Sequence, residues 1–237
     1  MRRGRVKMLQ ETIDVKFLRQ VSIFGGLNEE DLFKIVNIGS RKNYPKGSVI
    51  VMEAEIGAAM FTIISGKVKV VRSDGEGREV ILSILSESDV FGELSLLDGH
   101  ARSASVITTT PTDVFVIHRQ DFMHLLHEYP SISIALLSEL ALRLRKADAQ
   151  IKNLSLKGAE ERVASVVLQL AEEVGRVKHG RVVIDDLPVQ QDLANMAGTS
   201  RETFSRMLHT FINQGEVTQQ GNTLIINDYE AFSNLHK

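Results

Sequence analysis

The sequence predicts an α+β protein with three successive parts: a β-roll (double-stranded β-helix), one long helix, and a C-terminal winged helix-turn-helix. Three observations carry this prediction. Short apolar segments separated by turn residues fill residues 44–118, an apolar heptad pattern runs through residues 130–157, and two amphipathic segments around a glycine precede a hairpin pattern near the C-terminus. We therefore expect domains at 1–129, 130–157 and 158–237.

The first of these domains opens with helical patterns. Residues 1–40 read as short helices, with Asn28 in the position of an N-cap and Glu29 and Glu30 in the first turn. From residue 44 the pattern changes to runs rich in β-branched residues, separated by turn signals such as PKG, EIG and LDGH. Many short strands at this spacing predict an antiparallel sandwich or roll of about eight strands.

The composition excludes several classes of protein. Apolar residues make up 43% and charged residues 24% of the 237 residues, which is typical of a soluble globular chain. No apolar run approaches the roughly 20 residues that span a bilayer, and the basic N-terminus lacks the apolar segment of a secretion signal. There are no cysteines, which excludes disulfides, thiolate zinc sites and cysteine-ligated iron–sulfur clusters. We expect a cytoplasmic protein with no membrane partner.

Residues 130–157 carry the longest periodic pattern. Apolar residues recur there at alternating steps of three and four, at Leu137, Leu140, Leu144, Ala147, Ile151 and Leu154. So narrow a stripe favours the seam of a parallel two-helix coiled coil, and hence a homodimer through this helix. The alternative is a helix that packs on its own domain.

The C-terminal part has the pattern of a helix-turn-helix. Gly198 supplies the turn, Ser200 is an N-cap for the second helix, and Phe204 and Leu208 point back into the domain. The opposite face then presents Arg201, Glu202, Ser205 and Arg206. Arginine reads the guanine edge and glutamate accepts from cytosine, so this face predicts double-stranded DNA as a partner. The alternative is an αα-hairpin whose Glu202 and Arg206 form an ordinary i,i+4 pair.

The charge of this region limits its non-specific binding. Residues 160–237 contain seven Lys/Arg against eleven Asp/Glu, a net charge of −4. Non-specific DNA affinity depends on phosphate neutralisation. We therefore expect weak background binding, with phosphate contacts from helix N-termini and uncharged groups. Besides the four residues on the exposed face of the second helix, the candidates for DNA contact are Gln190, Gln191, Thr199 and Ser200.

A second candidate site lies in FGELSLLDGHARSAS, residues 91–105. It places Glu93 and Arg102 around a short Leu-rich bend. Either the two side chains form a salt bridge, or they hold the two ends of one ligand that carries hydroxyls and a phosphate. A monoanionic phosphate binds an arginine fork with additional N–H and O–H donors. Gly92 lets the backbone approach closely, and Leu94, Leu96 and Leu97 would wall the site. We favour the ligand.

Together, FGELSLLDGHARSAS, GTSRETFSRML and the order of the three parts resemble the cyclic-AMP receptor protein (CRP/FNR) family of bacterial transcription regulators, over about residues 17–227. The resemblance implies a cyclic-nucleotide-binding β-roll in which Glu93 holds the ribose 2′-hydroxyl. Arg102 and Ser103 would bind the cyclic phosphate, Leu94 and Ser95 would belong to the same cassette, and Arg143 would brace Glu93.

For the DNA-binding part, the resemblance implies that Arg201, Glu202 and Arg206 read a palindrome of the type TGTGA-N6-TCACA. It also implies contact with RNA polymerase through surface loops, of which residues 175–181 are a candidate, and activation of transcription without enzymatic activity. A nucleotide bound against the dimer helix would set the spacing of the two recognition helices, which must match half-sites about one helical turn apart.

The chain differs from the family at the residues expected to contact the base of the nucleotide. Members that answer to cyclic AMP carry a Thr-Ser pair where this chain has Ala147 and Asp148. Asp148 only accepts hydrogen bonds, which suits the paired donors of guanine better than adenine. Cyclic AMP remains the first expectation, and the alternatives are cyclic GMP or cyclic di-GMP, or no ligand at all.

Two further features bear on the ligand. Ser86 and Ser88 replace glycines usual in the family, which we interpret as a changed loop with the pocket retained. Haem sensing is disfavoured, although His100 and His118 remain candidate ligands.

Overall fold

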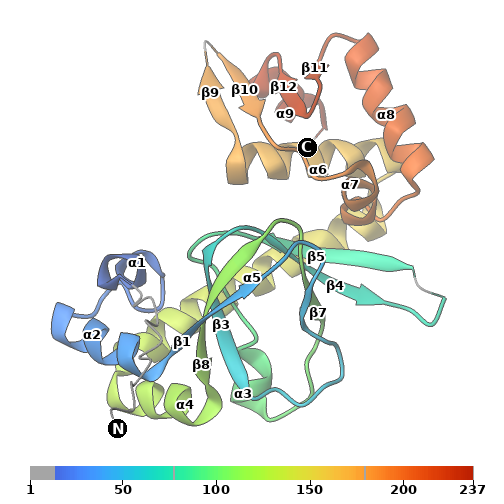
Figure 1. Ribbon diagram of the computed structural model, residues 1–237. Coiled ribbons are helices and arrows are strands. Elements are labelled where there is room, and N and C mark those ends of the chain that lie inside the picture. Colours follow the sequence, from blue (N-terminus) through green and yellow to red (C-terminus); the bar gives the residue numbers. More distant parts are fainter. Residues whose placement is uncertain (1–13, 77, 179, 237) are drawn as a thin grey trace, which may run out of the picture. The chain divides into compact units, whose positions relative to one another are not determined.

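The computed structural model describes residues 14–76, 78–178 and 180–236 (Figure 1). The basic N-terminal segment that we interpreted as lacking a secretion signal lies almost wholly outside these residues. Contacts divide the chain into two compact units. The first comprises the described residues up to Asp74 together with Leu82–Arg143, and the second comprises Gly75–Ile81 and the described residues from Leu144 onward. The α+β fold class is confirmed.

The β-roll consists of two four-stranded antiparallel sheets, with strand orders β1-β8-β3-β6 and β2-β7-β4-β5. The elements in this part of the chain are α1 (Val15–Gln20), α2 (Glu29–Ile38), β1 (Ser40–Tyr44), β2 (Val49–Val51), β3 (Ala59–Ser65), β4 (Val68–Ser73), β5 (Glu79–Leu85), β6 (Val90–Phe91), α3 (Leu94–Asp98), β7 (Ser105–Thr108), β8 (Thr112–His118) and α4 (Arg119–Glu128). The eight expected strands are therefore present.

One boundary in this region differs from the prediction. The roll begins with β1 at Ser40, the last residue of the segment expected to be helical and four residues before the expected start of the strands. The strand residues Arg41, Lys42 and Asn43 are all exposed, so no apolar alternation announces them. Pairing with β8, in which Lys42 lies opposite Val114, imposes the extended conformation.

The core of the roll is organised around β3. Met60 packs in one apolar cluster, with residues of α1, α2, α4 and α5, while Phe61 and Ile63 pack in a second cluster between the sheets. The strand is therefore buried on both faces, and its alternating side chains pack in two different apolar clusters. Phe61 stacks on Phe91 of β6 with ring centroids 5.0 Å apart. This packing holds β6 in place where the candidate nucleotide-binding segment, residues 91–105, begins.

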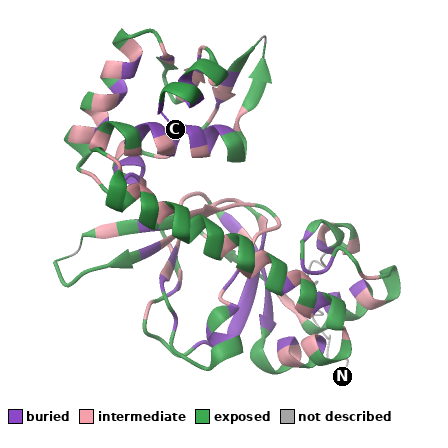
Figure 2. Ribbon diagram, turned by 180° about the vertical axis from the view of Figure 1, so that it is seen from behind, coloured by how far each residue is buried: buried purple, intermediate pink, exposed green. Residues whose placement is uncertain are grey.

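Helix α5 (Pro130–Leu156) follows α4 directly, and Pro130 starts it, as the missing N–H of proline allows at a first helical position. The helix is continuous for 27 residues. Its early turns bury Ile132 and Leu136 in the core of the first unit. Farther along, Leu137, Leu144 and Ile151 are 65%, 64% and 62% exposed, and Figure 2 shows the long helix mostly green along one side.

The second unit contains the helix-turn-helix and a four-stranded sheet of order β11-β12-β10-β9. Its elements are α6 (Ala159–Val174), β9 (Arg176–Lys178), β10 (Arg181–Ile184), α7 (Gln190–Met196), α8 (Arg201–Asn213), β11 (Val217–Gln220), β12 (Thr223–Ile226) and α9 (Tyr229–His236). The expected hairpin is present as β11–β12.

Two features of this unit depart from the prediction. Residues 175–181 were expected to be a loop that precedes a short strand, but a further strand, β9, lies there and pairs antiparallel with β10, with Val177 opposite Val182. The helix α9 was not expected at all. It is held by contacts distant in sequence, since Phe232 and His236 pack on Phe211 of α8 with ring centroids 5.5 and 4.9 Å away.

Candidate functional site

Glu93 is a buried carboxylate with one unused oxygen. It follows β6 and is 2% exposed. Its Oε1 accepts a hydrogen bond from Nη1 of Arg143 at 3.0 Å, and Nη2 of that arginine donates to the carbonyl of Val90 at 2.6 Å. Its Oε2 is buried and has no hydrogen-bond partner among the described residues. Burial raises the pKa of Glu93, and the charge of Arg143 opposes that shift.

Arg102 is a buried cation whose hydrogen-bond acceptors among the described residues are all uncharged. It is 8% exposed. Its Nη1 donates to Oγ of Ser95 at 2.8 Å and to the carbonyl of Gly92, and its Nη2 donates to the carbonyl of Ala59 at 2.7 Å. Burial lowers the pKa of Arg102. In the part of the chain that the structure describes, Arg102 and Glu93 do not form an ion pair, so the salt-bridge alternative is not the arrangement observed.

Two glycines make room for the guanidinium. Gly92 has φ +81°, and a Cβ there would lie 2.8 Å from Nη1 of Arg102. A Cβ on Gly57 would lie 2.0 Å from Oγ of Ser95 and 3.0 Å from Cζ of Arg102. Larger residues at either position would displace the arginine. The sequence pointed to Gly92 but treated Gly57 only as part of a turn signal, because its neighbour Ser95 is 38 residues away in the chain.

The remaining cassette residues divide between surface and core. Ser103 is exposed directly after Arg102. Leu94 and Leu97 are 43% and 37% exposed and remain available to a ligand. Leu96 was expected to wall the site, but this is wrong, because the short helix α3 turns it into the core beneath the roll, where it is fully buried.

The residues expected at the nucleotide base lie on α5. Ala147 and Asp148 are both exposed, four and five residues after Arg143. Ser86 and Ser88, for which the sequence predicted a changed loop, lie in a turn before β6. Ser88 adopts φ +71°, a conformation that favours glycine, and its N–H donates to the carbonyl of Ile63 at 2.9 Å.

The second candidate site is the face of α8. Ser200 caps this helix, its Oγ accepting from the N–H of Thr203 at 3.2 Å, and Gly198 supplies the turn with φ +58°. Phe204 and Leu208 are buried in the domain, as expected. The face opposite them carries exposed Arg201, Glu202 and Arg206 and half-buried Ser205.

The charged side chains of Arg201, Glu202 and Arg206 lie on the exposed face of α8. Within the described residues Glu202 and Arg206 do not form the ion pair that an ordinary αα-hairpin would use. Backbone hydrogen bonding at the start of α8 and the hydroxyl of Ser200 lower the pKa of Glu202, so it remains an ionised acceptor.

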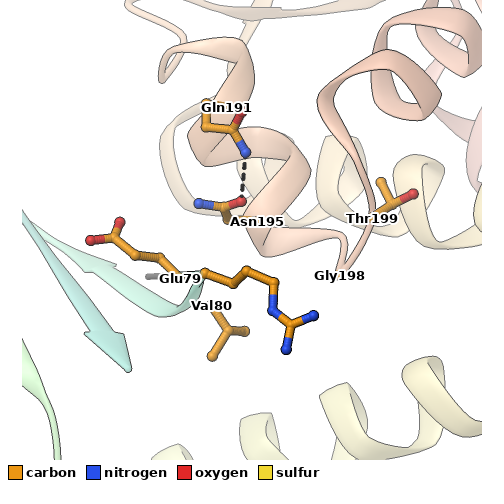
Figure 3. Close-up of a pocket in the computed structure, with 7 residues that line it drawn as sticks. Glu79, Val80, Gln191, Asn195, Gly198 and Thr199 are labelled. Carbon is orange, nitrogen blue, oxygen red and sulfur yellow. Dashed lines mark hydrogen bonds between the residues drawn. The ribbon is translucent and has the colours of Figure 1, made fainter. Parts of the chain in front are cut away.

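The neighbouring polar candidates lie on α7 and the turn. Figure 3 shows Gln191 on α7 donating through Nε2 to Oδ1 of Asn195, at 2.9 Å, with Gly198 and Thr199 at the following turn. Gln191 is exposed, while Gln190 and Thr199 are half-buried. Among the residues described, no group of three or more His, Cys, Asp and Glu could hold a metal ion. Nor is any described helix both long and apolar enough to cross a membrane.

Known proteins show the same two parts in the same order. Residues 41–129 match the cyclic nucleotide-binding domain family, and residues 161–235 match the Crp-like helix-turn-helix domain family. The chain is 34% identical over 199 residues to the cyclic AMP receptor protein of Thermus thermophilus, covering 82% of this chain and 87% of that protein.

Two further proteins extend the comparison. The chain is 32% identical over 218 residues to the CRP-like cAMP-activated global transcriptional regulator of Mycobacterium tuberculosis, covering 92% of this chain and 97% of the relative. The structure of FixK2 from Bradyrhizobium japonicum aligns with a TM-score of 0.75 at 23% identity, covering 84% of this chain and 98% of that one, which shows the shared fold.

Proposed function

This chain belongs to the cyclic-AMP receptor protein (CRP/FNR) family of transcription regulators, and on that premise we propose that it is a homodimeric regulator whose DNA affinity is controlled by a purine cyclic nucleotide held between Glu93 and Arg102. Family membership accounts for the nucleotide-binding and helix-turn-helix domains. The effector, the DNA sequence and the partner proteins are the content of the proposal.

The observation that carries the proposal is the buried Oε2 of Glu93, which has no hydrogen-bond partner in the part of the chain that the structure describes. A buried acceptor without a donor is costly in free energy, and a ribose hydroxyl would satisfy it. Arg102 complements it at the other end of the same cassette. Its guanidinium has five N–H groups, of which three donate to other described residues, so two are left for the oxygens of a cyclic phosphate.

Cyclic AMP is the first candidate effector, because the relatives at 34% and 32% identity are named for it. Asp148 supports the alternative of a guanine nucleotide, cyclic GMP or cyclic di-GMP. Its carboxylate can accept from the N1–H and 2-amino group of guanine, whereas adenine offers only its 6-amino group as a donor on that edge. A regulator that needs no ligand is the remaining alternative.

The exposed stripe on α5 supports the homodimer. Leucine and isoleucine side chains at 62–65% exposure along one helix are removed from water when two copies pair. We expect Leu144→Glu to convert the dimer to a monomer, because it places two charges in the seam. Sedimentation velocity of the variant and of Lys152→Glu, a control on the same helix, checks this. A dimeric Leu144→Glu protein would contradict the assignment.

For DNA, we propose that Arg201, Glu202 and Arg206 read each half of a TGTGA-N6-TCACA palindrome. The β9–β10 hairpin, with exposed Arg176, Val177 and Lys178, is the proposed surface for RNA polymerase, and activation is the proposed outcome. The two units would be coupled by a change in the arrangement of the α5 helices that alters the spacing of the α8 helices.

Fluorescence anisotropy of a labelled TGTGA-N6-TCACA duplex tests the proposal. The protein is titrated alone and with cyclic AMP, cyclic GMP or cyclic di-GMP, and a scrambled duplex is the control. Tighter binding with a single nucleotide identifies the effector. Equal binding under all conditions would overturn nucleotide control, and no preference over the scrambled duplex would overturn the assigned DNA sequence.

A further inference from the structure

The apolar stripe on α5 assigns heptad positions to this helix. Its a positions are Leu137, Leu144 and Ile151, and its d positions are Leu140, Ala147 and Leu154. The positions beside the stripe, e and g, are occupied within residues 136–155 by Leu136, Ala141, Arg143, Asp148, Gln150 and Ser155. Two of these six residues are charged, Arg143 at a g position and Asp148 at an e position, and their charges are opposite.

The spacing of these two residues suits a second copy of the chain. In a parallel two-helix coiled coil, a g residue faces the e residue five positions later on the partner helix. Arg143 and Asp148 are five positions apart on one continuous helix, so a symmetric parallel dimer contains two such opposite-charge pairs. An antiparallel pairing would instead bring Arg143 against Arg143 and Asp148 against Asp148. Charge complementarity therefore favours a parallel second copy on this face of α5.

Arg143 is already oriented within its own subunit. Its Nε donates to Oε1 of Glu139 at 3.0 Å, its Nη1 to Oε1 of Glu93 at 3.0 Å and its Nη2 to the carbonyl of Val90 at 2.6 Å. A guanidinium has five N–H groups, so two have no acceptor among the described residues. The side chain is 31% exposed. These contacts hold the arginine at the edge of the stripe, where its remaining donors can reach a partner helix.

Asp148 makes no competing contact in its own chain. It is exposed, and within the described parts of the chain its carboxylate forms neither a hydrogen bond nor an ion pair. Arg145, three positions before it, and Lys152, four positions after it, have the spacing of intrahelical partners. Neither of these cations is paired with Asp148 in the chain as described. The carboxylate is therefore available to a group on another chain.

Resting on the proposed homodimer, we infer that Asp148 pairs with the partner subunit's Arg143 and so fixes the parallel register of the two α5 helices. Because Arg143 also holds Glu93, one guanidinium then serves both the dimer seam and the nucleotide site of its own subunit. Asp148 is engaged in this way before a nucleotide binds. A guanine base that uses the same carboxylate must compete with the partner subunit's Arg143.

The dissociation constant of the full-length dimer tests the pair. It is measured without nucleotide, by sedimentation velocity over a dilution series. Asp148→Arg replaces both opposite-charge pairs with like-charge pairs. Partly exposed pairs contribute modestly to stability, so we expect the constant to rise about tenfold. In an Arg143→Gln background the same substitution should raise it less than about twofold, because the repelling charge is absent.

Two further backgrounds complete the design. Arg143→Lys keeps a positive charge at the g position, so Asp148→Arg should weaken that dimer as strongly as it weakens wild type. This background also carries the test if the glutamine variant does not fold. Lys152→Gln removes a cation from the same helix at a position away from the seam, and the loss caused by Asp148→Arg should again equal that in wild type.

Different results would overturn the ion pair and the homodimer. Equal losses in the wild-type and Arg143→Gln backgrounds, or no loss in any background, would overturn the pair and leave the dimer standing. A loss that disappears only with Lys152→Gln would overturn the pair by assigning Asp148 to its own helix. A wild-type chain that is monomeric at every concentration would overturn the proposed homodimer, and the pair with it.

Discussion

The two candidate sites of this regulator are constructed in opposite ways. Glu93 and Arg102 are almost fully buried, and each has hydrogen-bonding groups that no described residue uses. Arg201, Glu202 and Arg206 are exposed on α8, where water satisfies them. A buried site therefore shows which groups it leaves for a ligand, namely an acceptor oxygen on Glu93 and N–H donors on Arg102 that no described residue uses. An exposed site shows only which residues can reach a partner.

This difference also predicts how the sites respond to substitution. Truncating a buried side chain to alanine leaves its protein partners unpaired and the ligand unbound, so the effect is large and extends to stability. Removing an exposed reader affects the complex alone. The predictions below test this contrast in order of decreasing effect.

The largest effect is expected for Arg102→Ala. Two charge-assisted hydrogen bonds to the cyclic phosphate are lost, at about 1.5–3 kcal/mol each. Nucleotide affinity, measured by isothermal titration calorimetry, should fall at least about 100-fold. Arg102→Lys, which keeps the charge but loses the fork, should lie between the variant and wild type. Unchanged affinity in a folded Arg102→Ala protein would contradict the site.

The next effect is expected at the exposed face. Arg206→Ala should weaken binding to the palindrome by about 1–3 kcal/mol and reduce the preference for guanine at one position in each half-site. Because Arg206 lies outside the buried site, nucleotide affinity should equal that of wild type. Anisotropy with single-position duplex variants measures both quantities, with the exposed Arg145→Ala as control. An equal loss on every duplex would make Arg206 a phosphate contact instead.

A smaller loss of binding and a gain of stability are expected for Glu93→Gln. Burial raises the pKa of Glu93 in the folded protein. The stabilisation that this carboxyl contributes is complete below its pKa in the unfolded chain and is lost as the pH rises through the raised folded value. At neutral pH, wild type loses stability because it must bury an ionised carboxylate or bind a proton. The neutral glutamine does neither, so the variant should be the more stable protein.

Urea denaturation across pH checks the sign. The difference in free energy of unfolding between Glu93→Gln and wild type should shrink as the pH falls and wild-type Glu93 becomes protonated. Nucleotide affinity should fall about tenfold, since one charge-assisted bond to the ribose is weakened. A stability difference that does not depend on pH would show that the buried charge is not its cause.

The smallest effect is expected for Ser200→Ala. Losing the N-cap of α8 should lower the free energy of unfolding by about 1 kcal/mol. Ser200→Asn, which retains a capping oxygen, should restore it. Chemical denaturation measures this change. An alanine variant as stable as wild type would show that the Ser200 cap does not stabilise α8. Nucleotide affinity should not change in either variant.

Much of the fold could be predicted because its signals are local. The heptad of α5, the glycine turn with its Ser200 cap and the β11–β12 hairpin each depend on residues within a few positions of one another. Strand β1 could not be predicted, because its exposed residues carry no alternation and only β8 makes them extended. The helix α9 was missed for the same reason, since Phe211, distant in sequence, holds it.

The sequence by itself determined the order of the parts, the α8 residues that face away from the domain core, and the choice of Glu93 and Arg102 as candidate site residues. It could do so because periodicity and motif spacing are properties of neighbouring residues. Only the tertiary structure decided that Oε2 of Glu93 has no hydrogen-bond partner among the described residues and that Gly57 makes room beside Arg102. Burial and hydrogen bonding between distant segments arise only when the chain packs, so no local pattern encodes them.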